Sequence, residues 1–361
     1  MDLVIFGAQG IALSVYKAIC SCRPKRAVRC FLVSERGNNA PKLAGIPVIE
    51  TEIFTKELSQ EEKNNVEVLI ATPENVMSDV EKILELQGFR YLVRMDSRRL
   101  ADLLGYYYSS EREYLPLSAL PVGFRRADME VYMAKSYKDK PLSGRYNLPL
   151  WVIPIQVGAV LCKEQMADIL DCDGEGISGK NGNYCELTGL YWLWKNRLCM
   201  ETESRGVRYY GLFQYRRILS IDDEDMMRLL NNGVDAVLPY PMVYEPNIET
   251  HHKRYLRDED WQALLEALEE LHPEYAEAFP QILRSEYMYN YNIVLARREV
   301  LLDYCNWLFP VLERTEQLSV PQGNERSDRY IGFMGESLCT LYFMYNRNKL
   351  NIKHVGCRLL I

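Results

Sequence analysis

The sequence predicts an α/β protein of two domains, the first of which is built on a small parallel, doubly wound sheet. The 361 residues, 48% of them hydrophobic, are enough to bury two cores of ordinary size. Short apolar runs alternate with helical patterns up to about Met95, and this alternation is typical of parallel sheets. A second series of strand and helix patterns begins near Met129. We therefore expect a domain at 1–95, a connector at 96–127 and a second α/β domain at 128–361.

The apolar runs of the first domain are short enough to be strands. The expected strands are residues 2–6, 28–33, 46–49, 66–71 and 91–93. A helical pattern ends at about Cys22, another follows Ile49, and a third spans 74–87. The connector carries three consecutive tyrosines, 106–108, in a segment that we expect to be irregular or helical.

A glycine turn follows the first expected strand. Gly7 and Gly10 stand between that strand and a helix, where glycine lets a backbone approach a diphosphate and the helix supplies free N–H groups. Glu35, after the second strand, is suitably placed to hold ribose hydroxyls. The spacing departs from the six-residue dinucleotide fingerprint. Nucleotide binding and a packing requirement for glycine therefore both remain open.

In the second domain, residues 173–217 form a polar loop, an aromatic helix and a short apolar strand that ends in Arg216 and Arg217. When the bond between a sugar and a diphosphate breaks, the departing diphosphate gains negative charge. A metal ion or cationic side chains must offset that charge. The planar guanidinium group binds phosphate oxygens through two parallel N–H groups. The strand end therefore suits a diphosphate. The alternative is that the two arginines are surface ion-pair partners.

The residues around this strand supply further candidates. Lys180 and Asn181 open the aromatic helix and are expected to face a donor's base or phosphates, with helix capping as the alternative. Asp171 and Asp173 form an Asp-x-Asp pattern, but it lies in a glycine-rich loop before the helix. We interpret it as a solvated turn and expect no metal site.

Composition excludes several classes of protein. A net charge of −7 and a pI near 5.4 argue against nucleic acid as a partner. No run of 18 apolar residues is present, so we expect no membrane span. No signal-peptide pattern precedes the ten cysteines. Cys20 and Cys22 form one close pair, but no further ligands lie at the spacing of a zinc site. We therefore expect reduced thiols and a cytoplasmic location.

The first domain resembles a known group of nucleotide-sugar enzymes. VIFGAQG, AGIPVIE, VLIATPE and LELQGFRYLV occur in the order found in the N-terminal domains of bacterial sugar O-acyltransferases and nucleotide-sugar dehydratases. The resemblance covers residues 1–95. It implies a small Rossmann-like domain that holds a nucleotide or nucleotide-sugar, without a recognisable catalytic side chain.

The second domain resembles bacterial capsular and exopolysaccharide glycosyltransferases whose shared region was long known only as a domain of unknown function. The matching segments are ISGKNGNYCELTGLYWLWKN, YYGLFQYRR, NYNIVLARREVLLDYCNWLFPVLE and ERSDRYIGFMGES. The resemblance implies a GT-A-like fold and transfer of a hexosyl group from a nucleotide-sugar such as a UDP-sugar. Some members of that family transfer galactofuranose. The implied acceptor is a polysaccharide or a lipid-linked oligosaccharide, reached through peripheral contact with the inner membrane face.

Two departures from the family pattern concern histidines. Tyr137 stands where the family has histidine in a Thr/Ser-His-Lys segment, and Gln214 stands where it has His-Tyr-Arg-Arg. Gln214 can still form hydrogen bonds, so an altered donor specificity and a loss of activity are both open. In this sequence the donor segment is Gln214, Tyr215, Arg216 and Arg217, in place of the acidic Asp-x-Asp of GT-A enzymes.

An inverting transferase needs a carboxylate base for the acceptor hydroxyl. The candidates are Asp328 in ERSDRY and Glu336 in GFMGES. Two alternative functions are a non-catalytic nucleotide-sugar-binding protein of the same pathway and an NAD-dependent oxidoreductase. The second alternative lacks a Tyr-x-x-x-Lys or comparable catalytic set after residue 95.

Overall fold

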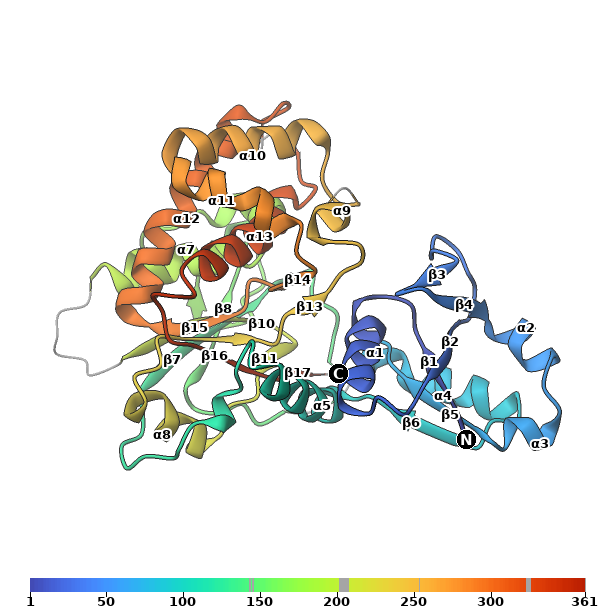
Figure 1. Ribbon diagram of the computed structural model, residues 1–361. Helices are drawn as coiled ribbons and strands as arrows, with labels where there is room; N and C mark the ends of the chain where they lie inside the picture. Colours follow the sequence, from blue (N-terminus) through green and yellow to red (C-terminus); the bar gives the residue numbers. More distant parts are fainter. Residues whose placement is uncertain (143, 145, 201–207, 253, 323–325, 361) are drawn as a thin grey trace. The chain divides into compact units, whose positions relative to one another are not determined.

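The computed structural model describes residues 1–142, 144, 146–200, 208–252, 254–322 and 326–360. The chain divides into two compact units. Unit 1 comprises Met1–Glu113 together with Met242–Pro246, and unit 2 comprises Tyr114–Pro241 and Asn247–Leu360. Each unit contains a sheet with helices (Figure 1), which confirms the prediction of an α/β fold.

Unit 1 contains a sheet with the strand order β3-β4-β2-β1-β5-β6. All neighbouring strands are parallel except β3 and β4. The strands are β1 (Asp2–Phe6), β2 (Val28–Val33), β3 (Lys42–Leu43), β4 (Ile46–Glu50), β5 (Val66–Ile70) and β6 (Tyr91–Arg94). The order reverses between β1 and β5, as in doubly wound folds.

Both faces of this sheet are buried, which explains why its strands are almost continuously apolar. Val4 and Phe6 pack on one face against α4, whereas Leu3 and Ile5 pack on the other against α1. The helices are α1 (Gly10–Cys22), α2 (Thr51–Lys56), α3 (Gln60–Lys63), α4 (Glu74–Leu86) and α5 (Ser97–Glu111). Helix α5, which the sequence analysis assigned to the connector, belongs to unit 1 and contacts α1.

Unit 2 is built on a mixed sheet with the strand order β16-β12-β15-β10-β7-β8-β9, and β11 pairs with both β10 and β17. Strands β10, β7, β8 and β9 are parallel to one another. The strands are β7 (Met129–Lys135), β8 (Val152–Gln156), β9 (Ile169–Leu170), β10 (Tyr209–Gln214), β11 (Arg217–Leu219), β12 (Ala236–Pro239), β15 (Val294–Arg297), β16 (Ile352–Val355) and β17 (Cys357–Leu359). The short strand β13 (Met242–Val243) belongs to unit 1, and β14 (Tyr287–Met288) belongs to unit 2.

Helices cover the sheet of unit 2. The longer helices are α7 (Leu187–Leu193), α8 (Asp223–Asn231), α10 (Asp258–Leu271), α11 (Pro273–Leu283), α12 (Arg298–Leu318) and α13 (Tyr330–Tyr345). Shorter helical segments are η1 (Leu117–Ala119), η2 (Ala159–Leu161), η3 (Ser178–Lys180), α6 (Asn181–Tyr184), η4 (Trp194–Leu198, a π-helical turn) and α9 (Ile248–His252). Helix α13 is apolar around most of its circumference and is almost completely buried, as expected for a core helix.

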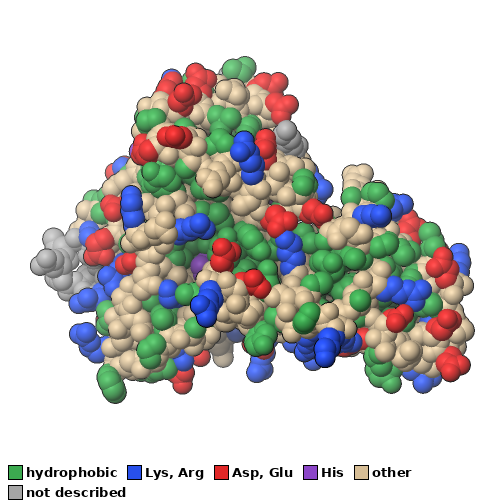
Figure 2. All heavy atoms as spheres, viewed as in Figure 1, with side chains coloured by type: hydrophobic (Ala, Val, Ile, Leu, Met, Phe, Trp, Pro, Cys, Tyr) green, Lys and Arg blue, Asp and Glu red, His purple; other side chains and the backbone are tan. Residues whose placement is uncertain are grey.

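Charged side chains of both signs are mixed on the visible surface (Figure 2). Figure 2 shows Lys and Arg side chains interspersed with Asp and Glu on the face in view. Within the described part of the chain, no helix combines the length and apolarity needed to cross a bilayer.

Candidate functional site

A cavity of about 340 Å³ lies in unit 2 where three parallel strands end. Strands β7, β8 and β10 run in the same direction, so their carboxyl ends meet at one edge of the sheet. This edge is the usual position of ligand sites in open α/β sheets. The lining residues are Ala134, Ser136, Lys138, Asp139, Lys140, Val157, Asn181, Gly182, Cys185, Glu186, Gln214, Tyr215, Arg216, Arg217 and Arg329.

The lining is strongly cationic. Two carboxylates, Asp139 and Glu186, face a larger set of cations, namely Lys138, Lys140, Arg216, Arg217 and Arg329. Positive charge gathered in a concave site attracts anions, and walls of low dielectric strengthen the attraction. The cavity therefore suits a ligand with more than one negative charge, such as a diphosphate.

Arg217 is held in place by two neighbours. Its guanidinium carbon lies 4.1 Å from the centre of the Tyr291 ring, and its Nη1 donates to Oε1 of Gln214 at 3.3 Å. Its backbone begins β11 and pairs with Leu359 of β17. The side chain is therefore positioned before any ligand arrives, which reduces the entropy that binding costs.

Arg216 has an unsatisfied donor at the cavity. Its Nε is buried and has no hydrogen-bond acceptor among the described residues. Its backbone carbonyl accepts from Leu360 N at 2.7 Å, and its guanidinium carbon lies 5.4 Å from the Tyr215 ring centre. Buried N–H groups of proteins are normally paired, so an acceptor supplied by a ligand or by water is expected here.

Gln214 links the arginines to a carboxylate. Its Nε2 donates to Oε1 of Glu186 at 3.3 Å, and the same oxygen accepts from Nδ2 of Asn292 at 2.9 Å. Gln214 therefore connects Glu186 to Arg217 through its two amide atoms. Gln214, which departs from the family pattern, is therefore part of an ordered polar network.

The structure separates the two helix-opening candidates. Asn181 lines the cavity, but its Nδ2 donates to the carbonyl of Cys185 at 2.7 Å and to Thr188 Oγ1 at 3.3 Å. Lys180 is not among the lining residues, and its Nζ pairs with Glu316. Asn181 therefore organises the local turn, and Lys180 is committed to an ion pair.

The two predicted bases also lie outside the cavity lining. Asp328 is 47% exposed and pairs with Arg326 at 3.3 Å. Glu336 is half-buried on α13, where its two oxygens accept from Tyr291 N at 2.9 Å and from Asn290 Nδ2 at 3.4 Å. Burial, with a smaller contribution from the charge of Glu186, raises the pKa of Glu336 to about 7.

Asp139 and Arg329 line the cavity, although neither was among the donor-site residues predicted from the sequence. Asp139 follows β7, and its Oδ2 accepts from Ser136 N at 2.7 Å. Burial raises the pKa of Asp139 to about 6, against the lowering effect of that hydrogen bond. Arg329 directly precedes α13 as its N-cap residue and donates from Nε to Cys185 Sγ at 3.3 Å. The position of Asp139 just beyond a strand end was the one signal in the sequence; Arg329 had none.

The donor set does not fit a divalent metal ion. Hard cations such as Mg²⁺ require several oxygen ligands, whereas the cavity offers two carboxylates among many cations. Within the described ranges, no group of three His, Cys, Asp or Glu side chains gathers as a possible metal site.

The Asp-x-Asp segment has a structural role at Asp171. The interpretation of that residue as solvated was wrong, because it is completely buried. It accepts hydrogen bonds from the N–H groups of Gly158 and Ala159 and from Ser178 Oγ. Asp173, by contrast, is exposed in a turn and accepts from Leu170 N.

In unit 1, close packing against backbone accounts for Gly7 of the N-terminal turn, whereas Gly10 meets only the mobile end of a side chain at short range. Gly7 has φ +124°, and a Cβ there would lie 2.6 Å from the carbonyl oxygen of Ala71. A Cβ on Gly10 would lie 2.9 Å from Cε of Met242. Glu35 is exposed after β2. Nucleotide binding at this turn stays a prediction.

A match to a known protein family covers most of unit 2. A family model described as a domain of unknown function, DUF4422, matches residues 145–348, more than half of the chain. The chain belongs to the DUF4422 family. The matched region contains the donor segment, Cys185 and Arg329, so most of the cavity is a feature of the family region.

One solved structure extends this comparison. The apo structure of WbbM, described as a bifunctional glycosyltransferase, is similar with a TM-score of 0.55 and 25% identity. The match covers 64% of this DUF4422 chain and 45% of WbbM, so the chain spans less than half of that protein. A search of curated proteins found no match.

Proposed function

We propose that this chain is a glycosyltransferase whose nucleotide-sugar donor places its diphosphate in the cationic cavity of unit 2. The observation that carries the proposal is the gathering of Arg216, Arg217 and Arg329, with two lysines, at the carboxyl ends of three parallel strands. Similarity to WbbM, a bifunctional glycosyltransferase, supports the same reaction class.

The cations have a direct role in this chemistry. Breaking the bond between sugar and diphosphate leaves negative charge on the phosphate oxygens, and preorganised cations stabilise that charge as it develops. Arg217 is already fixed on Tyr291, and Arg216 carries a buried donor that lacks an acceptor. The cavity can therefore offset the leaving-group charge with side chains alone.

We propose Asp139 as the general base of an inverting transfer. It lines the cavity, whereas Glu336 and Asp328 do not. A carboxylate with a pKa near 6 is largely ionised at neutral pH and is more basic than an ordinary aspartate. It would accept the proton of the acceptor hydroxyl as that oxygen attacks the sugar.

The finer assignments rest on the resemblance seen in the sequence. They comprise a UDP-sugar donor, a hexosyl group such as galactofuranose, and a polysaccharide or lipid-linked oligosaccharide acceptor. The pathway would be capsule or exopolysaccharide synthesis at the cytoplasmic membrane face. We propose them together as the substrates and setting of this site.

A second candidate is a nucleotide-sugar-binding protein without transferase activity. Gln214, which replaces a histidine of the resembling family, bridges Glu186 and Arg217. That bridge would preserve recognition of a diphosphate even if the lost histidine were needed for turnover.

Release of nucleoside diphosphate from a panel of nucleotide-sugars, with and without oligosaccharide acceptors, tests the proposal. If the chain is a transferase, we expect release of nucleoside diphosphate that depends on Asp139 and Arg217. Binding without release in any combination would favour the second candidate. Absence of both binding and release across the panel would contradict both.

A further inference from the structure

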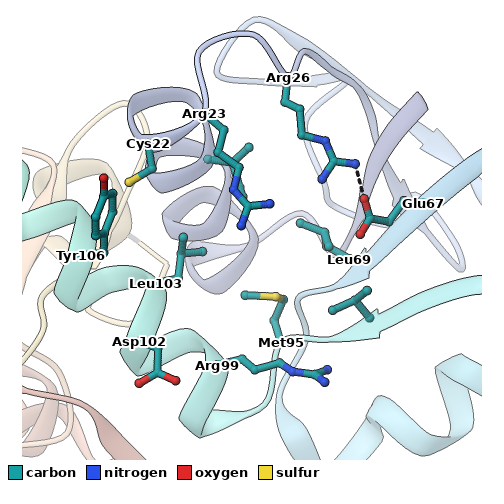
Figure 3. A pocket seen from close by; sticks show the side chains of 12 residues that line it. Cys22, Arg23, Arg26, Glu67, Leu69, Met95, Arg99, Asp102, Leu103 and Tyr106 are labelled. Carbon is teal, nitrogen blue, oxygen red and sulfur yellow. Dashed lines mark hydrogen bonds and ion pairs between the residues drawn. The ribbon is translucent and has the colours of Figure 1, made fainter. Parts of the chain in front are cut away.

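A second cavity, of about 510 Å³, lies within unit 1 (Figure 3). It is bounded by α1, α5 and the sheet face formed by β5 and β6. The lining residues are Ile19, Cys22, Arg23, Arg26, Glu67, Leu69, Val93, Met95, Arg99, Asp102, Leu103 and Tyr106.

The secondary structure explains why these side chains converge. Residues two apart on a strand point to the same face, so Glu67 and Leu69 of β5 project together. Residues three, four and seven apart on a helix share one side, and α5 contributes side chains with this spacing. These are Arg99, Asp102, Leu103 and Tyr106.

The floor of the cavity is apolar. Ile19 and Leu69 are each 5% exposed, and Met95 is 6% exposed. In Figure 3, Leu69, Met95 and Leu103 lie around the end of the Arg23 side chain. An apolar group placed here would leave water on binding, which contributes roughly 25 cal/mol per Å² of buried surface.

Three arginines line this cavity, and they differ in how they are paired. Arg26 forms an ion pair with Glu67, and Arg99 Nη1 donates to the carbonyl of Arg94 at 3.1 Å. The Arg23 backbone N–H donates to the carbonyl of Ile19 at 2.8 Å, but its guanidinium has no hydrogen-bond or ion-pair partner among the residues that the structure describes. Figure 3 shows its guanidinium directed into the space between α1, Leu69 and Met95. Arg23 is therefore the cation available to an incoming anion.

This cavity is separate from the glycine turn. Gly10 begins α1, and Cys22 ends it. With a rise of about 1.5 Å per residue, the two ends of this helix are roughly 18 Å apart. A ligand at Arg23 would therefore leave the turn at Gly7 and Gly10 untouched.

We propose that the unit 1 cavity binds a small phosphate monoester with an apolar body, with the phosphate on Arg23 and the body on the floor of Leu69 and Met95. Its volume falls within the range of roughly 300–1,000 Å³ that is usual for small-molecule sites. Arginine suits the phosphate because its planar fork can donate two parallel N–H groups. A nucleoside monophosphate, whose base presents an apolar ring face, and an isoprenyl phosphate, whose chain is apolar, can both meet this requirement.

The accessibility of the Cys22 thiol can be used to detect a ligand in this cavity. Cys22 lines the cavity and is half-buried, whereas Cys20, on the same helix, is exposed and is not among the lining residues. A bound ligand would cover the Cys22 thiol and leave Cys20 unchanged. Comparison of the two thiols reads this site separately from the unit 2 cavity.

The experiment measures alkylation of Cys22 and Cys20 in the full-length protein by peptide mass spectrometry. The probes are UMP, geranyl phosphate, uridine and inorganic phosphate at equal concentration. At a probe concentration about tenfold above Kd, UMP or geranyl phosphate should slow alkylation of Cys22 about tenfold. Uridine and inorganic phosphate should not. Protection of Cys22 by UMP would identify the ligand as a nucleotide, and protection by geranyl phosphate would identify it as an isoprenyl phosphate.

Variants at the helix end complete the test. Arg23→Ala should abolish the protection, and Lys25→Ala should retain it because Lys25 is an exposed cation outside the lining. Unchanged thermal midpoints would show that both variants are folded. No protection by either monoester, equal protection by inorganic phosphate or uridine, or full protection in Arg23→Ala would overturn the proposal.

Discussion

Arg329 donates a hydrogen bond from Nε to the Sγ of Cys185 at 3.3 Å, although 144 positions separate the two residues in the sequence. Both have left-handed backbone, with φ of +52° at Cys185 and +68° at Arg329. Such conformations cost of order 1–3 kcal/mol each in residues other than glycine and cluster at functional sites. The pair fixes a cation at the N-terminal end of α13, where Arg329 lines the unit 2 cavity.

Arg329→Ala should therefore weaken nucleotide-sugar binding. Loss of one charge-assisted contact of about 2 kcal/mol corresponds to roughly 30-fold in Kd. Cys185→Ala should weaken it only a few-fold, because it removes the support and leaves the cation. Titration calorimetry measures both, with Arg314→Ala as the control, an arginine paired with Glu270 outside the cavity. Wild-type affinity in Arg329→Ala would remove this residue from the site.

The pH dependence of transfer should report Asp139. A base must be deprotonated, so kcat/KM should rise as the pH increases through about 6. Asp139→Asn should lower kcat by at least about 100-fold and remove this rise. If Glu336→Gln removes it instead, the base is the carboxyl on α13, whose pKa is about 7.

The same titration affects stability, and its sign follows from the direction of the shift. Burial raises the pKa of Asp139 above its ordinary value of 3.8, so the folded chain binds this proton more tightly than the unfolded chain. The stability that this group contributes is fully present below 3.8 and is lost as the pH rises through about 6. Asp139→Asn should flatten this part of the pH–stability curve, measured by urea unfolding.

Sequence patterns predicted the sheet of unit 1 because its strands are short, apolar and separated by helices. They assigned α5 to a connector, although Asp96 accepts a hydrogen bond from Arg99 N and so caps the helix at a recognisable residue. A capping signal was present, but the segment lacked a strongly periodic apolar face.

Only the parts of the site that lie within one short sequence segment could be predicted. Arg216 and Arg217 end a strand, and both line the cavity. The contribution of Arg329 depends on where α13 packs, which no local pattern specifies. The high pKa of Asp139 arises from burial in the folded cavity, so the sequence gives no indication of it.

Asp171→Ala should destabilise the protein rather than act on donor binding directly. The substitution leaves the N–H groups of Gly158 and Ala159 and the hydroxyl of Ser178 without an acceptor. Each buried unsatisfied group costs about 1–3 kcal/mol, so a loss of at least about 3 kcal/mol is expected. Urea unfolding measures it. A change as small as that of the exposed Asp173→Ala would show that the buried network is unimportant.

Gly7→Ala should destabilise unit 1 through packing. The added Cβ would overlap the Ala71 carbonyl in a backbone conformation that alanine rarely adopts. Gly37→Ala is the matched control, because Gly37 also has positive φ but nothing lies within 4 Å of its added Cβ. A thermal midpoint that falls clearly further for Gly7→Ala supports packing as the reason for this glycine. Equal midpoints, with loss of nucleotide binding in Gly7→Ala alone, would favour the binding role.

The central claim is that arginines replace a metal ion at the donor diphosphate. Titration calorimetry with UDP and UDP-sugars, in EDTA and then with manganese, tests it on the wild type, Arg216→Ala, Arg217→Ala and Asp173→Ala. We expect equal affinity with and without metal, roughly 30-fold weaker binding in each arginine variant, and no change in Asp173→Ala. Binding that requires manganese, or wild-type affinity in both arginine variants, would contradict the account.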